Sequence, residues 1–280
     1  MGVVAEIERE LARLREQESG GDAPVLRTST MTHLVWAPPA WLPRARATLA
    51  GLQERHPSRT ILLVPERGRG ARVEARTSLY AVEVGESREA YAEVIEIRLR
   101  GAAVSHPASL VLPLLISDLP VFCRWRGEPA WDAPELAELV GVADRLVVDS
   151  SEWRRLPDGY GRLTRLFDRV AVSDIAYSRT LPWRARLAER WPGIGSAERL
   201  RVEGPRADAL LLAGWLRSRL GRAMSLSRRA AAEVVAVWVD GEPVEPPAAD
   251  GQSDSDLLSA ELDVFGRDPV YEEAVRAAAA

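Results

Sequence analysis

A small set of polar residues in this sequence carries the groups that could hold a phosphate or move a proton. They stand at the predicted ends of helices and strands and comprise His56, Ser58, Arg59, His106, Asp149 and Ser150. Arginine and hydroxyl groups at loop edges bind phosphate oxygens, so one interpretation is a sugar-phosphate-binding enzyme or sensor. The other interpretation is structural: a catalytic or metal-binding histidine must converge with a carboxylate, and a histidine beside a proline at an element boundary more often caps or packs.

The sequence contains no complete cofactor or nucleophile motif. Gly68-Arg69-Gly70 and Gly193-Ile194-Gly195 both lack the third glycine of a dinucleotide-binding loop, and neither leads from a strand into a helix. All 37 basic residues are arginine, which excludes a Schiff-base lysine and a phosphate-loop lysine. The single cysteine, Cys123, excludes an internal disulfide and a cysteine-rich zinc site. We therefore expect no cofactor, no metal and no catalytic residue.

Tryptophan is unusually frequent and often lies beside arginine. The chain has nine tryptophans against three phenylalanines, and these two residue types, Trp and Arg, are enriched at binding hot spots. One interpretation is that the tryptophans fill the core and the arginines shield them. The other is that the Trp–Arg pairs form a surface that binds a partner protein. Stacking of RNA bases on the tryptophans is a lesser option. The predicted partner-binding residues are Trp125, Arg126 and Glu128 at the end of a strand, and Trp183 with Arg184 at the start of a helix.

Composition narrows the class of partner and the location. The 280 residues carry a net charge of −4, which argues against a general nucleic-acid binder. The longest apolar stretch, residues 108–116, is too short to span a bilayer and contains Pro113. No secretory segment precedes the first predicted helix, so we expect a cytoplasmic protein without membrane contact. The sequence does not indicate its oligomeric state.

The periodicity of apolar residues predicts an α/β protein with two domains. Residues 1–24 form an amphipathic helix followed by a joint at 19–22, and residues 25–151 form a layered α/β domain with a largely parallel sheet. A smaller α+β domain follows over 152–280. Within these domains we expect a buried helix at 101–116 and an antiparallel strand at 257–265. We also expect strands at 121–125 and 199–203, and a helix at 207–220 that ends at Gly221. Because strands of a parallel sheet face the binding crevice with their carboxyl ends, Asp149, Ser150 and the loop 126–129 should lie at a functional edge.

Ordered blocks over residues 25–270 resemble the family of glucose-6-phosphate dehydrogenase assembly proteins known as OpcA. The blocks are 27–36, His-Pro-Ser-Arg-Thr at 56–60, Ser-His-Pro-Ala-Ser at 105–109, Ser-Asp-Leu-Pro-Val at 117–121, Trp-Arg-Gly-Glu-Pro at 125–129, Asp-Arg-Leu-Val-Val-Asp-Ser at 144–150, Asp-Ile-Ala-Tyr-Ser-Arg at 174–179 and Ala-Gly-Trp-Leu-Arg-Ser-Arg-Leu-Gly at 213–221. Two positions depart from the family pattern. Arg124 stands where a tryptophan is expected, and Ile175-Ala176-Tyr177 stands in place of Leu-Asn-Trp.

The resemblance implies a non-catalytic accessory protein that binds glucose-6-phosphate dehydrogenase. Such a protein would act as an allosteric activator that promotes the active oligomer of the dehydrogenase and supports the oxidative pentose phosphate pathway. In some relatives activation is tied to thiol redox state. With one cysteine, this chain has no second thiol for a disulfide relay of its own.

Overall fold

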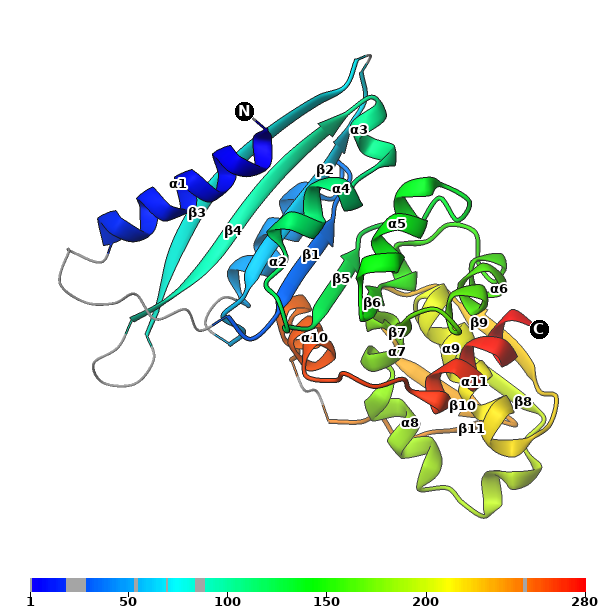
Figure 1. Cartoon of the computed structure of the whole chain (residues 1–280). Coiled ribbons are helices and arrows are strands. Elements are labelled where there is room, and N and C mark those ends of the chain that lie inside the picture. The colour runs from blue at the N-terminus through cyan, green and yellow to red at the C-terminus, as the bar shows by residue number, and fades with distance from the viewer. Residues whose placement is uncertain (1, 19–28, 53–54, 69, 84–88, 249–250) are drawn as a thin grey trace. The chain divides into compact units, whose positions relative to one another are not determined.

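Figure 1 shows the strands in a computed structural model of the chain. They form two sheets, and runs of branched aliphatic residues, such as residues 61–64, contribute to the larger one. Its strands are β1 (Thr32–Trp36), β2 (Arg59–Glu66), β3 (Arg72–Glu83), β4 (Glu89–Arg100), β5 (Val121–Trp125), β6 (Arg145–Val148) and β7 (Ala171–Asp174), in the order β3-β4-β2-β1-β5-β6-β7. The pairs β1–β2, β1–β5, β2–β4 and β5–β6 are parallel, whereas β3 and β4 are antiparallel. The predicted α/β class with a largely parallel sheet is confirmed.

The chain divides into two units, and both are discontinuous in sequence. The first unit comprises Met1–Val147 and Asp254–Phe265; the second comprises Val148–Ser253 and Gly266–Ala280. The structure describes residues 2–18, 29–52, 55–68, 70–83, 89–248 and 251–280, so the predicted joint at 19–22 lies outside them. Two details of the predicted domains are wrong: residues 152–280 are not one continuous domain, and the N-terminal helix belongs to the first unit.

Short helices accompany the sheet in the first unit. They are α1 (Val3–Glu18), α2 (Leu42–Ala50), α3 (Ala102–Ser105), α4 (Ala108–Val111), η1 (Leu112–Leu114), α5 (Pro134–Val142) and α10 (Asp254–Leu262). Helix α1 packs on β3 and buries Ile7 and Leu11, as its amphipathic spacing predicts. The predicted single helix at 101–116 is wrong, because Pro107 and Pro113 divide the segment into α3, α4 and η1.

The segment predicted as a strand at 257–265 is also different in the structure. Its first part is helical and forms most of α10. Leu258 and Leu262 are four residues apart and both are buried, so the apolar pattern fits a helix face. The hydroxyl of Ser255 in this helix donates to the carbonyl of Thr48 in α2 at 3.0 Å.

The second unit combines a small sheet with helices. Its remaining strands are β8 (Arg199–Glu203), β9 (Ser225–Arg229), β10 (Ala236–Val239) and β11 (Glu242–Pro243), in the order β11-β10-β8-β9. Its helices are η2 (Ser150–Glu152), α6 (Asp158–Leu163), η3 (Thr164–Leu166), α7 (Ile175–Arg179), α8 (Leu181–Ala188), η4 (Gly193–Ser196), α9 (Arg206–Leu220) and α11 (Pro269–Ala279). Apolar residues of α8 and α9 pack with one face of the small sheet to form the core. Within the described segments, no helix has the length and apolar character to cross a membrane.

Candidate functional site

Two aspartates of the second unit lie at the ends of strands and belong to a cluster of polar side chains. Asp149 directly follows β6, and its carboxylate accepts the backbone N–H of Ser151 at 3.1 Å. Asp174 ends β7 and caps α7, where its Oδ1 accepts the N–H groups of Ala176 at 2.9 Å and Ser150 at 3.0 Å. Aspartate is favoured at both places because its short carboxylate reaches the unpaired N–H groups of a following helical turn. The carboxyl ends of two strands therefore carry acidic groups.

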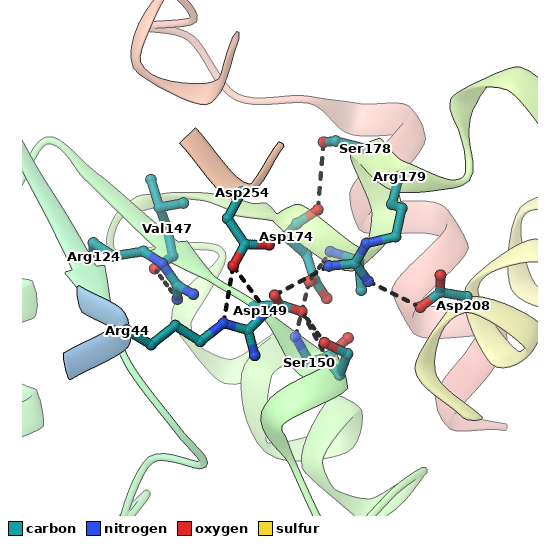
Figure 2. Close-up of polar contacts among 12 residues, drawn as sticks. Arg44, Arg124, Val147, Asp149, Ser150, Asp174, Ser178, Arg179, Asp208 and Asp254 are labelled. Carbon is teal, nitrogen blue, oxygen red and sulfur yellow. Dashed lines mark hydrogen bonds and ion pairs between the residues drawn. The ribbon is translucent and has the colours of Figure 1, made fainter. Parts of the chain in front are cut away.

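An arginine joins these strand ends to a helix, as Figure 2 shows. Arg179, the last residue of α7, donates through Nη2 to Asp149 at 3.2 Å and through Nη1 to Asp208 in the first turn of α9 at 3.3 Å. We call Asp149, Asp174, Asp208 and Arg179 the aspartate–arginine cluster. It connects the ends of β6, β7, α7 and α9 within one unit.

The cluster contains more negative than positive groups, and its aspartates are buried. Asp174 and Asp208 are 1% and 0% exposed, and their Oδ2 atoms accept no hydrogen bond from the described residues. Burial raises the pKa of Asp174 to about 7; the negative charge of Asp149 adds to this effect, while hydrogen bonds from Ser150 and Ala176 oppose it. Burial also raises the pKa of Asp208 to about 7, against the opposing charge of Arg179. Both carboxyls therefore bind protons near neutral pH.

The hydroxyl groups beside the cluster bond to each other. The Ser150 hydroxyl lies 3.0 Å from the phenolic oxygen of Tyr160, which also donates to the carbonyl of Ala207 at 3.4 Å. Burial raises the pKa of Tyr160 well above its usual range. A serine nucleophile needs a base within hydrogen-bond reach. Beside Ser150 lie a phenol that stays protonated and the carboxyl of Asp174, which binds a proton near neutral pH. The aspartate–arginine cluster can therefore connect the ends of β6, β7, α7 and α9, and its carboxyl groups can bind protons.

The residues of the predicted polar cluster divide between the two units. Asp149 and Ser150 lie in the second unit, whereas the other four residues lie in the first unit and have separate partners. Arg59 is 3% exposed and donates to Glu93 at 2.7 Å and to the carbonyl of Leu114 at 2.8 Å. The exposed His106 pairs with Glu138 at 2.9 Å. The phosphate interpretation of Arg59 stays a prediction: a carboxylate and a carbonyl accept from its Nε and Nη1, whereas its buried Nη2 has no partner among the described residues.

The two remaining residues of that set line a very small cavity in the first unit. Its volume is about 10 Å³, enough for one water molecule. His56 and Ser58 contribute to the lining together with His33. Nε2 of His56 lies 2.7 Å from Oγ of Ser259. Burial, the charge of Arg124 and the neighbouring His56 lower the pKa of His33 to about 3, so His33 is neutral at physiological pH.

Three of the five predicted partner-binding side chains are not exposed. The ring of Trp125 stacks on that of Trp36, its paired residue on β1, with 5.0 Å between centroids. Arg126 is buried, with its guanidinium 5.3 Å from the ring centre of Trp41. Trp183 is buried in the core of the second unit, and its Nε1 donates to the carbonyl of Val234 at 3.1 Å. The expectation that these side chains reach outward is wrong, because neighbouring elements supply partners for them.

Glu128 and Arg184 keep part of their surface exposed. The Arg184 guanidinium lies 3.7 Å from the ring centre of Tyr177 and donates to the Thr180 hydroxyl at 3.2 Å. A partner role for this set of five residues stays a prediction. Cys123 behaves as expected for a lone cysteine in a strand: it is buried, and burial raises its pKa to about 12.

Sequence reasoning missed three members of the aspartate–arginine cluster. Asp174 carried a usable signal, since an aspartate between a strand and a short helix is typical of an N-cap. Arg179 and Asp208 carried none, because each is an ordinary charged residue within a helix. Their pairing depends on how α7 and α9 cross, which no local pattern specifies.

Two family models match successive parts of the chain. The model described as the glucose-6-phosphate dehydrogenase subunit N-terminal domain matches residues 50–165, and the corresponding C-terminal domain model matches residues 170–245. Together they cover more than half of the 280 residues.

Relatives with curated names agree with these models. Two proteins named "Putative OxPP cycle protein OpcA" are 26% identical over 177 residues in Synechocystis sp. and 28% identical over 178 residues in Nostoc punctiforme. Each match covers 59% of this chain but only 37% and 38% of the respective relative, so the chain spans well under half of their length.

One solved structure aligns with most of the chain at low similarity. The crystal structure of a "putative oxidoreductase" from Magnetospirillum magnetotacticum aligns with 89% of this chain and 99% of its own, at 12% identity and a TM-score of 0.45. That likeness is too low to carry an argument about function. The two family models and the curated relatives, in contrast, agree with each other, and the chain belongs to the OpcA family of glucose-6-phosphate dehydrogenase assembly proteins.

Proposed function

We propose that this chain is a non-catalytic accessory protein that binds glucose-6-phosphate dehydrogenase and promotes its assembly into the active oligomer. The observation that carries the proposal is the order of the two family models, which run through both units and are both described as parts of a glucose-6-phosphate dehydrogenase subunit. The names of the curated relatives add the oxidative pentose phosphate cycle. The protein would support that pathway through its partner.

The contacts of the candidate polar residues support a binding protein over a sugar-phosphate enzyme. Arg59 is held by Glu93, and Arg179 by Asp149 and Asp208. A phosphate would have to displace carboxylates that are buried and already paired with these guanidinium groups, which costs the existing ion pairs. The arrangement favours structure over turnover.

An accessory protein acts through coupling between its own binding and that of the substrate. Coupling of about 1–3 kcal/mol would change substrate affinity roughly 5- to 150-fold. Activation should therefore be strongest at limiting glucose 6-phosphate. By linkage, glucose 6-phosphate must then tighten the complex of the two proteins by the same factor.

The test uses the purified chain and the dehydrogenase of the same organism. Dehydrogenase activity is assayed with and without the chain at limiting and saturating substrate, and the mass of the dehydrogenase oligomer is measured by light scattering. We expect higher activity and a larger or more stable oligomer when the chain is present. A heat-denatured sample of the chain serves as the control.

Two results would contradict the proposal. One is that the dehydrogenase shows the same oligomer mass and activity with and without the chain. The other is that the chain alone reduces a nicotinamide cofactor with glucose 6-phosphate, or binds the sugar phosphate by calorimetry. The second result would favour the enzyme or sensor interpretation.

A further inference from the structure

One face of the small sheet in the second unit is turned toward solvent and presents a row of side chains across all four strands. The strand register places Pro243 of β11, Trp238 of β10, Arg201 of β8 and Ser227 of β9 side by side. Pro243, Arg201 and Ser227 are exposed, and Trp238 is half-buried. We call this row and its neighbours on the same face the outer face.

Core and outward-facing residues alternate along the strands, and this explains which side chains lie on the outer face. Leu200 and Val202 of β8, and Val237 and Val239 of β10, point to the opposite side and form the core of the unit. Successive residues of a strand point to opposite faces, so the residues between them must point outward. The sequence Arg-Leu-Arg-Val-Glu of β8 therefore places Arg199, Arg201 and Glu203 on the outer face.

At the centre of the face, an arginine lies on a tryptophan. The Arg201 guanidinium is 4.5 Å from the ring centre of Trp238. Among the described residues Arg201 forms no ion pair, although it is exposed and fully charged. Stacking on the ring restricts the motion of the long side chain while the N–H groups at the rim of the guanidinium plane remain able to donate. A guanidinium held in this way binds a carboxylate with a smaller loss of entropy than a freely moving one.

The charges around Arg201 are paired with one another. Arg199 and Arg229 lie on the same face, and the register pairs Arg229 with Glu203, 3.5 Å from it. Arg199 lies 3.8 Å from Asp240, which is in the turn after β10. The carboxylate of Asp240 also accepts hydrogen bonds from the backbone N–H groups of Glu198 and Arg199. Among the described residues of the outer face, Arg201 is thus a cation without an ion pair, on a chain whose net charge is −4.

We infer that the outer face binds an acidic segment of a partner protein, with one carboxylate seated on the Arg201 guanidinium. Two parallel N–H donors of arginine match the two oxygens of a carboxylate, and such charge-assisted pairs are about twice as strong as neutral hydrogen bonds. The neighbouring Ser227 hydroxyl can donate to the backbone of the same segment, and Trp238 and Pro243 offer apolar contact. The identification of the partner as glucose-6-phosphate dehydrogenase rests on the function proposed above.

The experiment measures the affinity of full-length variants for immobilised glucose-6-phosphate dehydrogenase by biolayer interferometry. Arg201→Glu reverses the charge, and Arg201→Lys keeps the charge but removes the paired donors. Arg165→Glu is the matched control, because Arg165 is an exposed arginine of η3 in the same unit and forms no ion pair with the described residues. Thermal melting of each variant verifies that the fold is intact.

We expect Arg201→Glu to weaken binding about 30-fold, as for a hot-spot residue, and Arg201→Lys to weaken it by a smaller factor. Arg165→Glu should bind like the wild type. A glutamate-rich peptide should compete with the dehydrogenase for the wild-type chain but not for Arg201→Glu. A single-stranded oligonucleotide should not compete; competition by the oligonucleotide in place of the peptide would overturn the inference.

The outcomes separate this inference from the proposed function. If the wild type and Arg201→Glu bind the dehydrogenase equally, the outer face is not the docking surface, and the accessory function stands. If the wild type itself does not bind, the accessory function is wrong and the assignment of this partner to the outer face is wrong with it. A loss of binding confined to the Arg201 variants, with unchanged melting temperatures, supports both.

Discussion

Arg179 donates a hydrogen bond to the carboxylate of Asp149 at 3.2 Å, across 30 residues of sequence. The same guanidinium donates to Asp208 at 3.3 Å. Both aspartates are buried, with 3% and 0% of their surface exposed. The cation therefore compensates two carboxylates that water cannot solvate, and the cost of removing it should exceed that of removing any surface arginine.

Replacing Arg179 by methionine should lower the free energy of unfolding by about 3–5 kcal/mol, because it removes a cation that pairs with two buried carboxylates. Urea denaturation measures this change. Arg186→Met is the control: Arg186 pairs with the exposed Glu189 at 3.0 Å on α8, and such surface pairs contribute at most about 1 kcal/mol. Equal losses in the two variants would show that the cluster does not depend on Arg179.

The contribution of Asp174 to stability should fall as pH rises from about 4 to 7. Its folded pKa is about 7, above the ordinary value of 3.8, so the folded state binds more protons than the unfolded state between these limits. Asp174→Asn removes this contribution but keeps an oxygen for the N–H groups of Ser150 and Ala176.

Urea denaturation at pH 5 and pH 8 provides the measurement for Asp174. Between these pH values the wild type should lose on the order of 2–3 kcal/mol more stability than Asp174→Asn. Glu245→Gln, at an exposed position in the same unit, should follow the wild type. A pH dependence of Asp174→Asn as steep as that of the wild type would show that Asp174 is ionised throughout.

The nine tryptophans should differ sharply in what they contribute to stability. Trp183 is 5% exposed and lies in a core, whereas Trp191 is 68% exposed. Trp183→Ala should cost about 3–5 kcal/mol of folding stability through lost burial and the cavity left behind. Trp191→Ala should change stability by less than about 0.5 kcal/mol. Similar melting temperatures for the two variants would contradict the core position of Trp183.

Close packing of α9 against α11 requires a glycine at position 214. A Cβ built there would lie 2.2 Å from the carbonyl oxygen of Ala274, so Gly214→Ala should force the helices apart and cost about 1–3 kcal/mol. Gly161→Ala in α6 is the matched control, because a Cβ there meets nothing within 4 Å. That change should stabilise the protein by about 0.5–1 kcal/mol, since alanine loses less backbone entropy in a helix. Differential scanning calorimetry of both variants measures these changes in stability. An increase in stability in Gly214→Ala would contradict the close contact between α9 and α11.

Local patterns predicted much of the fold. The strands at 121–125 and 199–203 have the predicted bounds, and α9 differs from its prediction by one residue at its start. These segments combine strong apolar periodicity with clear end signals, such as Gly221 in the left-handed conformation after α9. Where a segment has apolar residues without a clear period, as at 257–265, a strand and a helix could not be distinguished.

The site was less predictable because its geometry depends on contacts between distant residues. Trp125 looks like an exposed strand end until Trp36 is placed beside it by the pairing of β1 and β5. Likewise, Arg59 looks available for phosphate until Glu93 is brought beside it by the pairing of β2 and β4. A single sequence specifies which residues can form a strand, but the register and order of the strands decide which side chains remain exposed.

The return of α10 to the first unit has a consequence for synthesis on the ribosome. Ser259 of this helix bonds to His56 across 203 residues, and Leu262 lines a cavity with Leu49 and Leu52. At about 5–20 residues per second, translation from residue 147 to residue 254 takes roughly 5–20 seconds. Throughout that interval the nascent first unit exposes the apolar surface that α10 later covers. Translation speed through the second unit thus determines how long this surface is open to chaperones and to neighbouring nascent chains.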